Sequence, residues 1–428
     1  MEKLNAERPR APAMLGGRRW AGERAGYLDA ITRLLWPGPA QASVGRASSE
    51  RFADPAREFI VLPRRSDPRL VIPSERAVAA AAVRRYGVPD RRTSDLRKWA
   101  LWLAAVTGAA SSVFPDRLLV YEPRGSDTIS SYLQDVLGRE LWLSMYVSGA
   151  RANRKPVLQL LTPEGGAVGF AKIGVDPLTR RLVTTEHDGL LRLASAGLRS
   201  LMVPRVLHRG QWRGLEVVVL SPLPLGLHAR RVSGSQLRAA MREVAASAGL
   251  VREPLQSASY RDSLLERLAL APEGPERVEL EQALGALMES VGETMLSYGA
   301  WHGDWSPWNM ARARGRLMVW DWERFSTGVP LGFDALHLWL RLEVARRHKP
   351  ARAAAELINE AAALLRPLGV GSSEARLTAL LYLCERSVRD LADRQEAAGA
   401  WLGSPRQWLI PAIASGVQTL APRSSPTG

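Results

Sequence analysis

Three polar side chains, Asp304, Asn309 and Asp321, lie in a stretch that is otherwise rich in tryptophan, residues 301–323. Asp304 follows a glycine, Asn309 comes five residues later, and Asp321 comes twelve residues after that, just past an apolar run (317–320) that we expect to be a short strand. A positioned Asp can accept the proton of a hydroxyl, and an Asn with a second Asp can hold Mg2+ on the phosphates of a nucleotide. The same residue types can instead satisfy backbone groups in a turn.

The full pattern of this stretch resembles the aminoglycoside phosphotransferase and choline kinase group, whose fold is protein-kinase-like. That group carries H-G-D-x-x-x-x-N, which begins here at His302, followed by D-x-[DE], which begins here at Asp321. The resemblance implies that Asp304 is the catalytic base and that Asn309 and Asp321 are the metal ligands. It also implies that His302 packs under the metal-binding segment. Glu323 is left open between a further metal contact and an ion pair with a nearby Arg.

A second acidic position follows from the same resemblance. Asp334, in the sequence Gly-Phe-Asp-Ala-Leu, resembles the Asp that ends the loop after the second motif. We expect it to cap the next helix and to hold the turn around Asp304 in place, which is a structural role.

Lys172 is one of only five lysines in the chain, and it lies inside an apolar run, 167–173, that we expect to be a strand. An unpaired buried ammonium is costly, so an anionic partner is expected. Glu186, fourteen residues later and near the expected start of a helix, fits best, and Asp188 is the other candidate. The resemblance implies that a Lys172–Glu186 pair orients the phosphates of the nucleotide. The alternative is a lysine on an edge strand that reaches out to water.

Strands are expected before residue 225 and helices after it. Apolar runs predict strands at 141–147, 156–162, 167–173, 204–208 and 215–220, and apolar spacing predicts helices at 236–248, 259–270, 276–297, 335–348, 351–365, 373–395 and 407–414. We expect 325–331 to be an irregular loop. The basic loop 148–155 either covers the phosphates or is an ordinary hairpin connection with solvated arginines. This order is typical of an α+β fold, here a two-lobed protein-kinase-like fold with a small β-rich lobe (140–225) and a helical lobe (226–420).

The residues before 140 carry no motif to which chemistry can be attached. We expect 1–50, rich in Arg, Ala, Gly and Pro, to be a mobile basic terminus. We expect 51–139 to be a mixed appendage that contains a hairpin, three helices and a further strand at 118–121. The longest apolar stretch, Trp99 to Phe114, is short for a membrane span and is expected to be a buried helix.

The formal charge of +15 is concentrated in the front of the chain, because residues 1–160 hold 26 Lys+Arg and 16 Asp+Glu. A basic region can meet nucleic acid, an anionic membrane surface or an acidic substrate. However, 53 of the 58 cations are arginines without a tight cluster, as in an arginine-rich proteome. The single cysteine, Cys384, excludes an internal disulfide, and with no secretion leader at the start it favours the cytoplasm.

Together these features predict an enzyme that transfers the γ-phosphoryl group of ATP, with Mg2+, to a hydroxyl of a small molecule. Aminoglycoside, choline-like and sugar acceptors all remain open. Glu343, Glu356 and Glu360 could hold a cationic acceptor, although helix surfaces carry such residues in any case. One alternative is a catalytically silent nucleotide-binding scaffold that docks a partner through its basic N-terminal region. Another is an adaptor for nucleic acid or a membrane surface, which only the charge supports. The oligomeric state is open.

Overall fold

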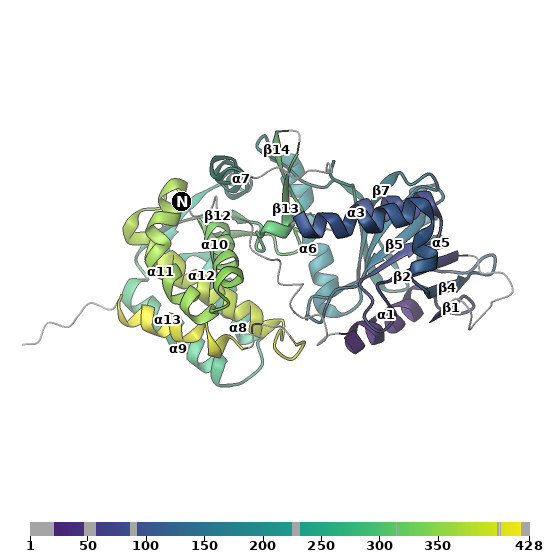
Figure 1. Cartoon of the computed structure of the whole chain (residues 1–428). Helices are drawn as coiled ribbons and strands as arrows, with labels where there is room; N and C mark the ends of the chain where they lie inside the picture. Colours follow the sequence, from purple (N-terminus) through teal and green to yellow (C-terminus); the bar gives the residue numbers. More distant parts are fainter. Residues whose placement is uncertain are drawn as a thin grey trace, which may run out of the picture. The chain divides into compact units, whose positions relative to one another are not determined.

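The computed structural model describes residues 21–46, 57–85, 92–224, 232–313, 315–399, 402 and 404–420. The expectation of a mobile terminus is wrong for 21–46, because these residues form a helix packed in a core and a strand of the large sheet. For the rest of 1–50 it lies outside the described residues. The chain divides into two compact units. The described residues of 11–187 and 204–229 form one, which we call the sheet unit; those of 188–203 and 230–428 form the other, which we call the helical unit. Both are drawn in Figure 1.

A nine-stranded antiparallel sheet forms the centre of the sheet unit, in the order β1-β4-β2-β3-β5-β6-β7-β10-β9. The strands are β1 Gln41–Arg46, β2 Arg57–Leu62, β3 Leu70–Pro73, β4 Asp116–Tyr121, β5 Trp142–Tyr146, β6 Val157–Leu161, β7 Ala167–Gly174, β9 Val206–Trp212 and β10 Leu215–Leu220. The expected boundary at 139/140 falls inside this sheet, because β3 pairs with β5. The residues expected to form a separate appendage and those expected to form the small lobe are therefore one unit.

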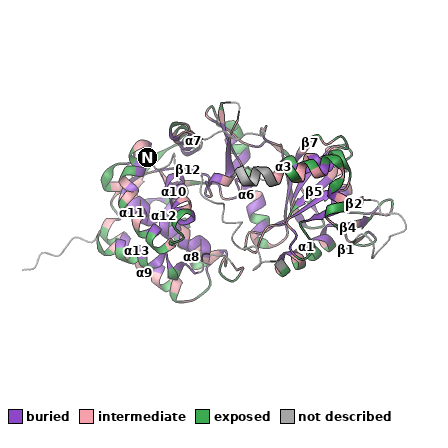
Figure 2. Cartoon of the chain, viewed as in Figure 1, coloured by how far each residue is buried: buried purple, intermediate pink, exposed green. Residues whose placement is uncertain are grey.

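Side chains of this sheet alternate between two cores, as the period of two along a strand requires. In β2, Phe59 and Val61 face a core shared with α1 (Ala21–Leu35) and α5 (Ile129–Leu137). The intervening Ile60 and Leu62 face a second core, shared with α2 (Arg76–Arg85), α3 (Arg92–Thr107) and α4 (Ala109–Val113). The sheet is thus covered by helices on both faces, and Figure 2 shows the strands mostly buried.

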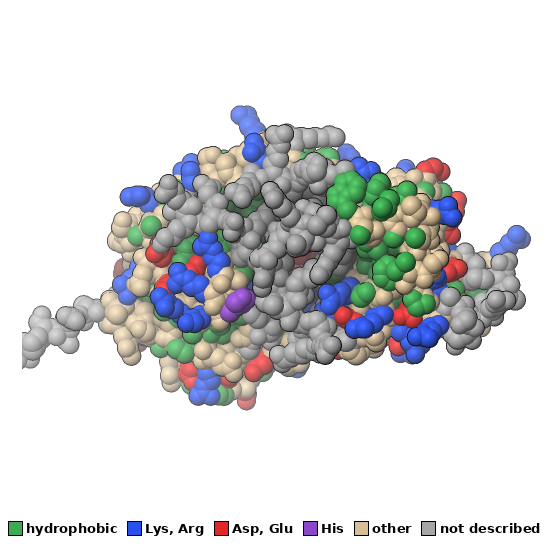
Figure 3. All heavy atoms as spheres, viewed as in Figure 1, with side chains coloured by type: hydrophobic (Ala, Val, Ile, Leu, Met, Phe, Trp, Pro, Cys, Tyr) green, Lys and Arg blue, Asp and Glu red, His purple; other side chains and the backbone are tan. Residues whose placement is uncertain are grey.

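The stretch Trp99 to Phe114 was expected to be a buried helix, and this prediction is wrong in part. It forms the end of α3 and all of α4, and α3 packs against α2 and the second core through one side only. On the other side Trp99 is 48% exposed and Leu103 is 56% exposed. Figure 3 shows hydrophobic side chains gathered over α3. Among the described residues, no helix is long and apolar enough to cross a membrane.

Helix α6 (Pro177–Ser195) begins nine residues before Glu186, so the prediction that Glu186 opens a helix is wrong. The sequence signal for the observed start of α6 is the pair Asp176-Pro177. The carboxylate of Asp176 accepts a hydrogen bond from the backbone N of Thr179 at 2.9 Å, and a proline fits the first helical position. Glu186 consequently lies in the middle of a rigid helix.

The helical unit contains seven α-helices and two small sheets within its described residues. The helices are α7 Gly234–Ala246, α8 Ser259–Ala269, α9 Pro275–Val291, α10 Phe333–Arg347, α11 Pro350–Leu365, α12 Ser372–Ala392 and α13 Ile410–Gln418. One sheet is β11-β12-β15, from Val251–Pro254, Met295–Trp301 and Ser326–Pro330; the other is β13-β14-β8, from Met310–Ala313, Arg316–Val319 and Leu201–Met202. A β-rich part and a helical part confirm the α+β class.

Two predictions near the motif are wrong. The helix expected over 276–297 ends at Val291, and the chain then enters strand β12, which leads to Trp301. The loop expected at 325–331 contains strand β15, which pairs with β12. Strand β12 lies between β11 and β15, so long-range pairing decides its conformation, and local spacing does not report such pairing.

Candidate active site

The turn that carries Asp304 is built on Gly303. Its φ is +84°, and a Cβ at this position would lie 2.3 Å from the carbonyl oxygen of Arg324, so only glycine fits. Arg389 donates from Nη1 to the Gly303 carbonyl oxygen at 2.6 Å. Glycine thus allows the chain to reverse closely against the 321–324 segment.

Asp334 fixes the same turn from the start of α10. Its carboxylate accepts hydrogen bonds from the backbone N of His302 at 2.8 Å and of Gly303 at 3.2 Å. Burial raises the pKa of Asp334 to about 7, against the opposing effect of those two N–H groups. The expected tie to the turn is confirmed. The cap position of α10, however, is Gly332, and Asp334 lies in the first turn.

Asp304 and Asn309 are in direct contact. A short 3-10 turn, Pro307–Asn309, brings the amide back so that Nδ2 donates to the Asp304 carbonyl oxygen at 2.9 Å and to Asp304 Oδ2 at 3.0 Å. Because the NH2 end of the amide is committed to Asp304, its oxygen is the end that can face another ligand. The Asp304 side chain is 34% exposed, so its carboxylate can be reached from outside.

His337, on α10, is a contact of Asp304 that the sequence analysis missed. Its Nε2 lies 3.1 Å from Asp304 Oδ1, and its Nδ1 lies 2.9 Å from the hydroxyl of Tyr382 on α12. Burial lowers the pKa of His337 to about 3, although Asp304 opposes this shift. The ring is therefore neutral at neutral pH. Tyr382 donates to Nδ1, and Nε2–H donates to Asp304.

Asp304 stays ionised in this environment. Burial alone would raise the pKa of Asp304, but the hydrogen bond from His337 and the charge of Arg341 lower it well below its ordinary value. An ionised carboxylate that is partly exposed and oriented by two neighbours has the properties of a proton acceptor. The only sequence signal for His337 is a polar residue among apolar ones, three positions after Asp334.

Asp321 is brought next to Asn309 by the β13–β14 hairpin. Met310 pairs with Val319, and the next backbone bond runs from the N of Trp320 to the carbonyl oxygen of Asn309 at 3.0 Å. Asp321 follows immediately, with a φ of +70°, in the left-handed region that few residues other than glycine adopt. Strained backbone of this kind clusters at functional sites.

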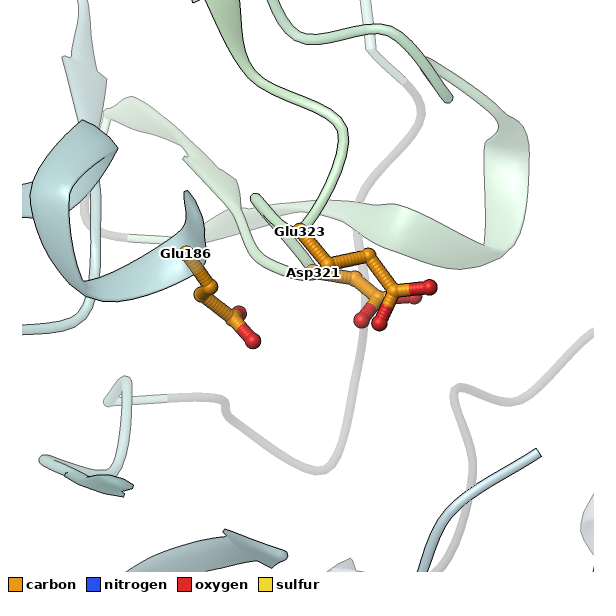
Figure 4. Close-up of side chains that lie close together, drawn as sticks. All are labelled: Glu186, Asp321 and Glu323. Atoms are coloured by element: carbon orange, nitrogen blue, oxygen red, sulfur yellow. The ribbon is translucent and has the colours of Figure 1, made fainter. Parts of the chain in front are cut away.

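Glu323 follows Asp321 on the same turn. The two side chains extend from it together in Figure 4, which also labels Glu186 of the sheet unit. A carboxylate oxygen of Asp321 and one of Glu323 lie within 4.8 Å of each other, and Glu323 is only 3% exposed. With the Asn309 amide, these are the oxygen ligands that Mg2+ takes in proteins, so the residues fit a magnesium site.

His302 has a packing role. It is fully buried, and its ring centroid lies 4.5 Å from that of Trp322. Its Nδ1 accepts from the backbone N of Asp304 at 3.1 Å, so its Nε2 carries the proton and donates to the carbonyl oxygen of Trp320 at 3.0 Å. This side chain therefore joins the Asp304 turn to the Asp321 turn.

Lys172 and Glu186 form a buried ion pair in the sheet unit. The Nζ of Lys172 lies 2.7 Å from Oε1 and 2.6 Å from Oε2 of Glu186, which is fully buried. Lys172 lies on β7 between Val157 of β6 and Val218 of β10. The edge-strand alternative is therefore wrong, and Glu186 is the partner, as predicted.

The loop between β5 and β6 holds one of the basic residues noted in the sequence. The guanidinium of Arg154 lies 3.7 Å from the ring centroid of Tyr27 on α1 and forms an ion pair with Glu23. Its side chain is 15% exposed. The alternative of a hairpin with solvated arginines is wrong for this residue.

No family model matches the sequence, and no curated protein matches it. The structure is similar to a thermostable mutant of aminoglycoside phosphotransferase APH(4)-Ia, at 15% identity over 68% of this chain and 98% of that chain, with a TM-score of 0.43. It is similar to choline kinase LicA from Streptococcus pneumoniae, at 15% identity over 68% of this chain and 97% of that chain, with a TM-score of 0.45.

A third matched structure is a choline/ethanolamine kinase family protein from Mesorhizobium loti, at 17% identity over 63% of this chain and 85% of that chain, with a TM-score of 0.37. Another is a ternary complex of the APH(4)-Ia mutant with ADP and hygromycin B.

Proposed function

We propose that this protein is a small-molecule phosphotransferase that moves the γ-phosphoryl group of ATP to a hydroxyl. The observation that carries the proposal is the set of contacts around Asp304. An ionised, partly exposed carboxylate is oriented by Asn309 and His337, and the β13–β14 hairpin brings Asp321 next to Asn309. These are the positions that the kinase-like motif assigns to a base and to metal ligands.

In the proposed reaction, the acceptor hydroxyl oxygen forms a bond to the γ-phosphorus, and the bond from that phosphorus to the bridging oxygen of ADP breaks. The hydroxyl proton passes to Asp304. His337 keeps the carboxylate in place through Oδ1, and Asn309 does so through Oδ2. Most of the expected rate enhancement comes from positioning and electrostatic stabilisation.

Two further sets of residues would bind the nucleotide. Asn309 and Asp321, with Glu323 as a further candidate, would hold Mg2+, which when bound supplies positive charge to the phosphate oxygens. Lys172 would contact the phosphates, and Glu186 would keep the ammonium of Lys172 in position.

The test is transfer of label from γ-labelled ATP to a panel of hydroxylated small molecules, with the Asp304→Asn variant as the blank. Asn has nearly the shape of Asp but cannot accept the proton, so at least a hundredfold loss of transfer is expected. Labelled product at equal rates in the wild type and the variant would overturn the assignment of Asp304. No transfer and no MgATP binding by the wild type would overturn the function.

A further inference from the structure

Arg341 and Arg389 both have buried nitrogens that no hydrogen bond fills among the described residues. Arg389 is buried, whereas Arg341 is partly exposed. Arg341 lies on α10, four residues after His337, so the two side chains share one face of the helix. Arg341 also contributes to the lowered pKa of Asp304. The buried Nε of Arg341 has no hydrogen-bond partner among the described residues.

An indole ring holds this guanidinium. The Cζ of Arg341 lies 4.8 Å from the centroid of Trp308, four residues after Asp304. In the segment 301–309 only Asp304 and Trp308 are half-buried, and every other residue is buried. A carboxylate, an indole and a guanidinium are thus the partly exposed groups where an acceptor would meet Asp304. Stacking on an aromatic ring leaves the N–H edge of an arginine available to a ligand.

A second arginine, Arg386, influences Arg341. Arg386 lowers the pKa of Arg341, after the larger effect of burial and against the effect of Asp304. Arg386 is itself paired with Asp390 at 2.9 Å. A guanidinium suits a bound anion, because a carboxylate or a phosphate accepts two parallel N–H bonds from it.

Two of the three acidic residues that could have held a cationic acceptor, Glu343 and Glu356, are already engaged. Glu343 is buried and forms ion pairs with Arg346 and Arg347. Glu356 is paired with Arg347 at 3.1 Å and with Arg352 at 2.7 Å. A polycationic or quaternary ammonium acceptor would therefore find these two carboxylates neutralised and would meet Arg341 near the base.

We propose that Arg341, held by Trp308, binds an anionic group of the acceptor, so that the substrate is a hydroxyl compound with a carboxylate or a phosphate. This inference rests on the proposed function. It concerns the acceptor only, and the anion is distinct from the phosphates of the nucleotide. Hydroxy acids and phosphate esters of polyols or sugars have the required chemistry.

The experiment uses matched pairs of acceptors that differ in one anionic group: glycerol and glycerate, and glucose and glucose 6-phosphate. Choline and hygromycin B serve as cationic probes. Binding to the full chain is measured by calorimetry, and transfer is measured with γ-labelled ATP. The anionic member of a pair should bind at least tenfold more tightly than its neutral partner. Arg341→Ala should remove that difference, and Arg341→Lys should restore only part of it.

The matched control is Arg346→Ala, which removes a guanidinium from the same helix on a different side. It should keep the preference for anions, and melting temperatures identify any variant that fails to fold. A cationic probe that binds best, or an anion preference that survives Arg341→Ala in a folded protein, would overturn the proposal. An Arg341→Ala variant that loses affinity for ADP and not for glycerate or glucose 6-phosphate would also overturn it, because the anion would then be the nucleotide's. If anions bind through Arg341 while no label is transferred, the proposed function fails and the anion site stands.

Discussion

Replacing Asp334 by Ala removes the acceptor of two backbone N–H groups at the base of the Asp304 turn. The two bonds, 2.8 Å from His302 and 3.2 Å from Gly303, are both buried. A buried donor left without a partner costs about 1–3 kcal/mol, so the free energy of unfolding should fall by about 2–6 kcal/mol. Asp334→Asn keeps the shape but offers a single acceptor oxygen, so about half of that loss is expected.

The stability difference between the wild type and Asp334→Asn should also change with pH in a definite direction. Burial raises the pKa of Asp334 to about 7 from an ordinary 3.8, so the folded chain binds this proton more tightly than the unfolded chain. The stability that this proton supplies is fully present below pH 3.8 and is lost as the pH rises to 7. Asn does not titrate. The difference in stability between the wild type and Asp334→Asn should therefore shrink between pH 4 and pH 7.

Urea unfolding at several pH values measures both effects, and phosphoryl transfer measures the consequence for Asp304. The control is Asp262→Asn, since the Asp262 side chain is 58% exposed and a change there should stay within about 0.5 kcal/mol. An Asp334→Ala protein that unfolds within 1 kcal/mol of the wild type, with unchanged transfer, would refute the role given to this carboxylate.

Three further outcomes are expected. Asp321→Ala should abolish Mg2+-dependent ATP turnover with an unchanged circular dichroism spectrum; full turnover would remove Asp321 from the metal site. Lys172→Met and Glu186→Gln should each lower the free energy of unfolding by about 3 kcal/mol, because each leaves a buried group unpaired. The double variant should lose less than the sum of the two single losses, and additive losses would show that the pair is not coupled. His337→Ala removes a hydrogen bond to ionised Asp304 while burial remains, so the pKa of Asp304 should rise. The acid limb of the pH profile of kcat/KM should then move to higher pH. An unmoved limb would contradict the role of His337 in keeping Asp304 ionised.

Local sequence predicted much of the candidate site because its parts are close along the chain. Asp304 and Asn309 lie within one turn, so their spacing in the sequence determines how close the two side chains lie. The Lys172–Glu186 pair was predictable for a different reason. A lysine in an apolar strand requires an anion, and few anions are near in sequence. Both inferences rest on the high cost of leaving a polar group unsatisfied.

The remaining features depend on contacts between distant segments. His337 reaches Asp304 across 33 residues, and no spacing rule connects them. Strand β12 contains alternating apolar residues that also fit the end of a helix, and its pairing with β11 and β15 decides between the two. The membership of the first four strands in the large sheet is equally non-local, since β3 reaches β5 across an intervening set of helices and a strand.

The pairing of β3 with β5 limits how this protein can be shortened. Leu70 lies opposite Tyr146 and Val71 opposite Met145, and the hydroxyl of Ser144 donates to the carbonyl oxygen of Val71 at 3.0 Å. A chain that starts at residue 140 would expose a bare sheet edge together with the apolar side chains of Leu143 and Met145, which is a template for aggregation. A soluble fragment that retains Lys172 should therefore begin ahead of α1, whose side chains fill the same core as Leu143 and Met145. The residues before 140 are as necessary for solubility as they are for the fold.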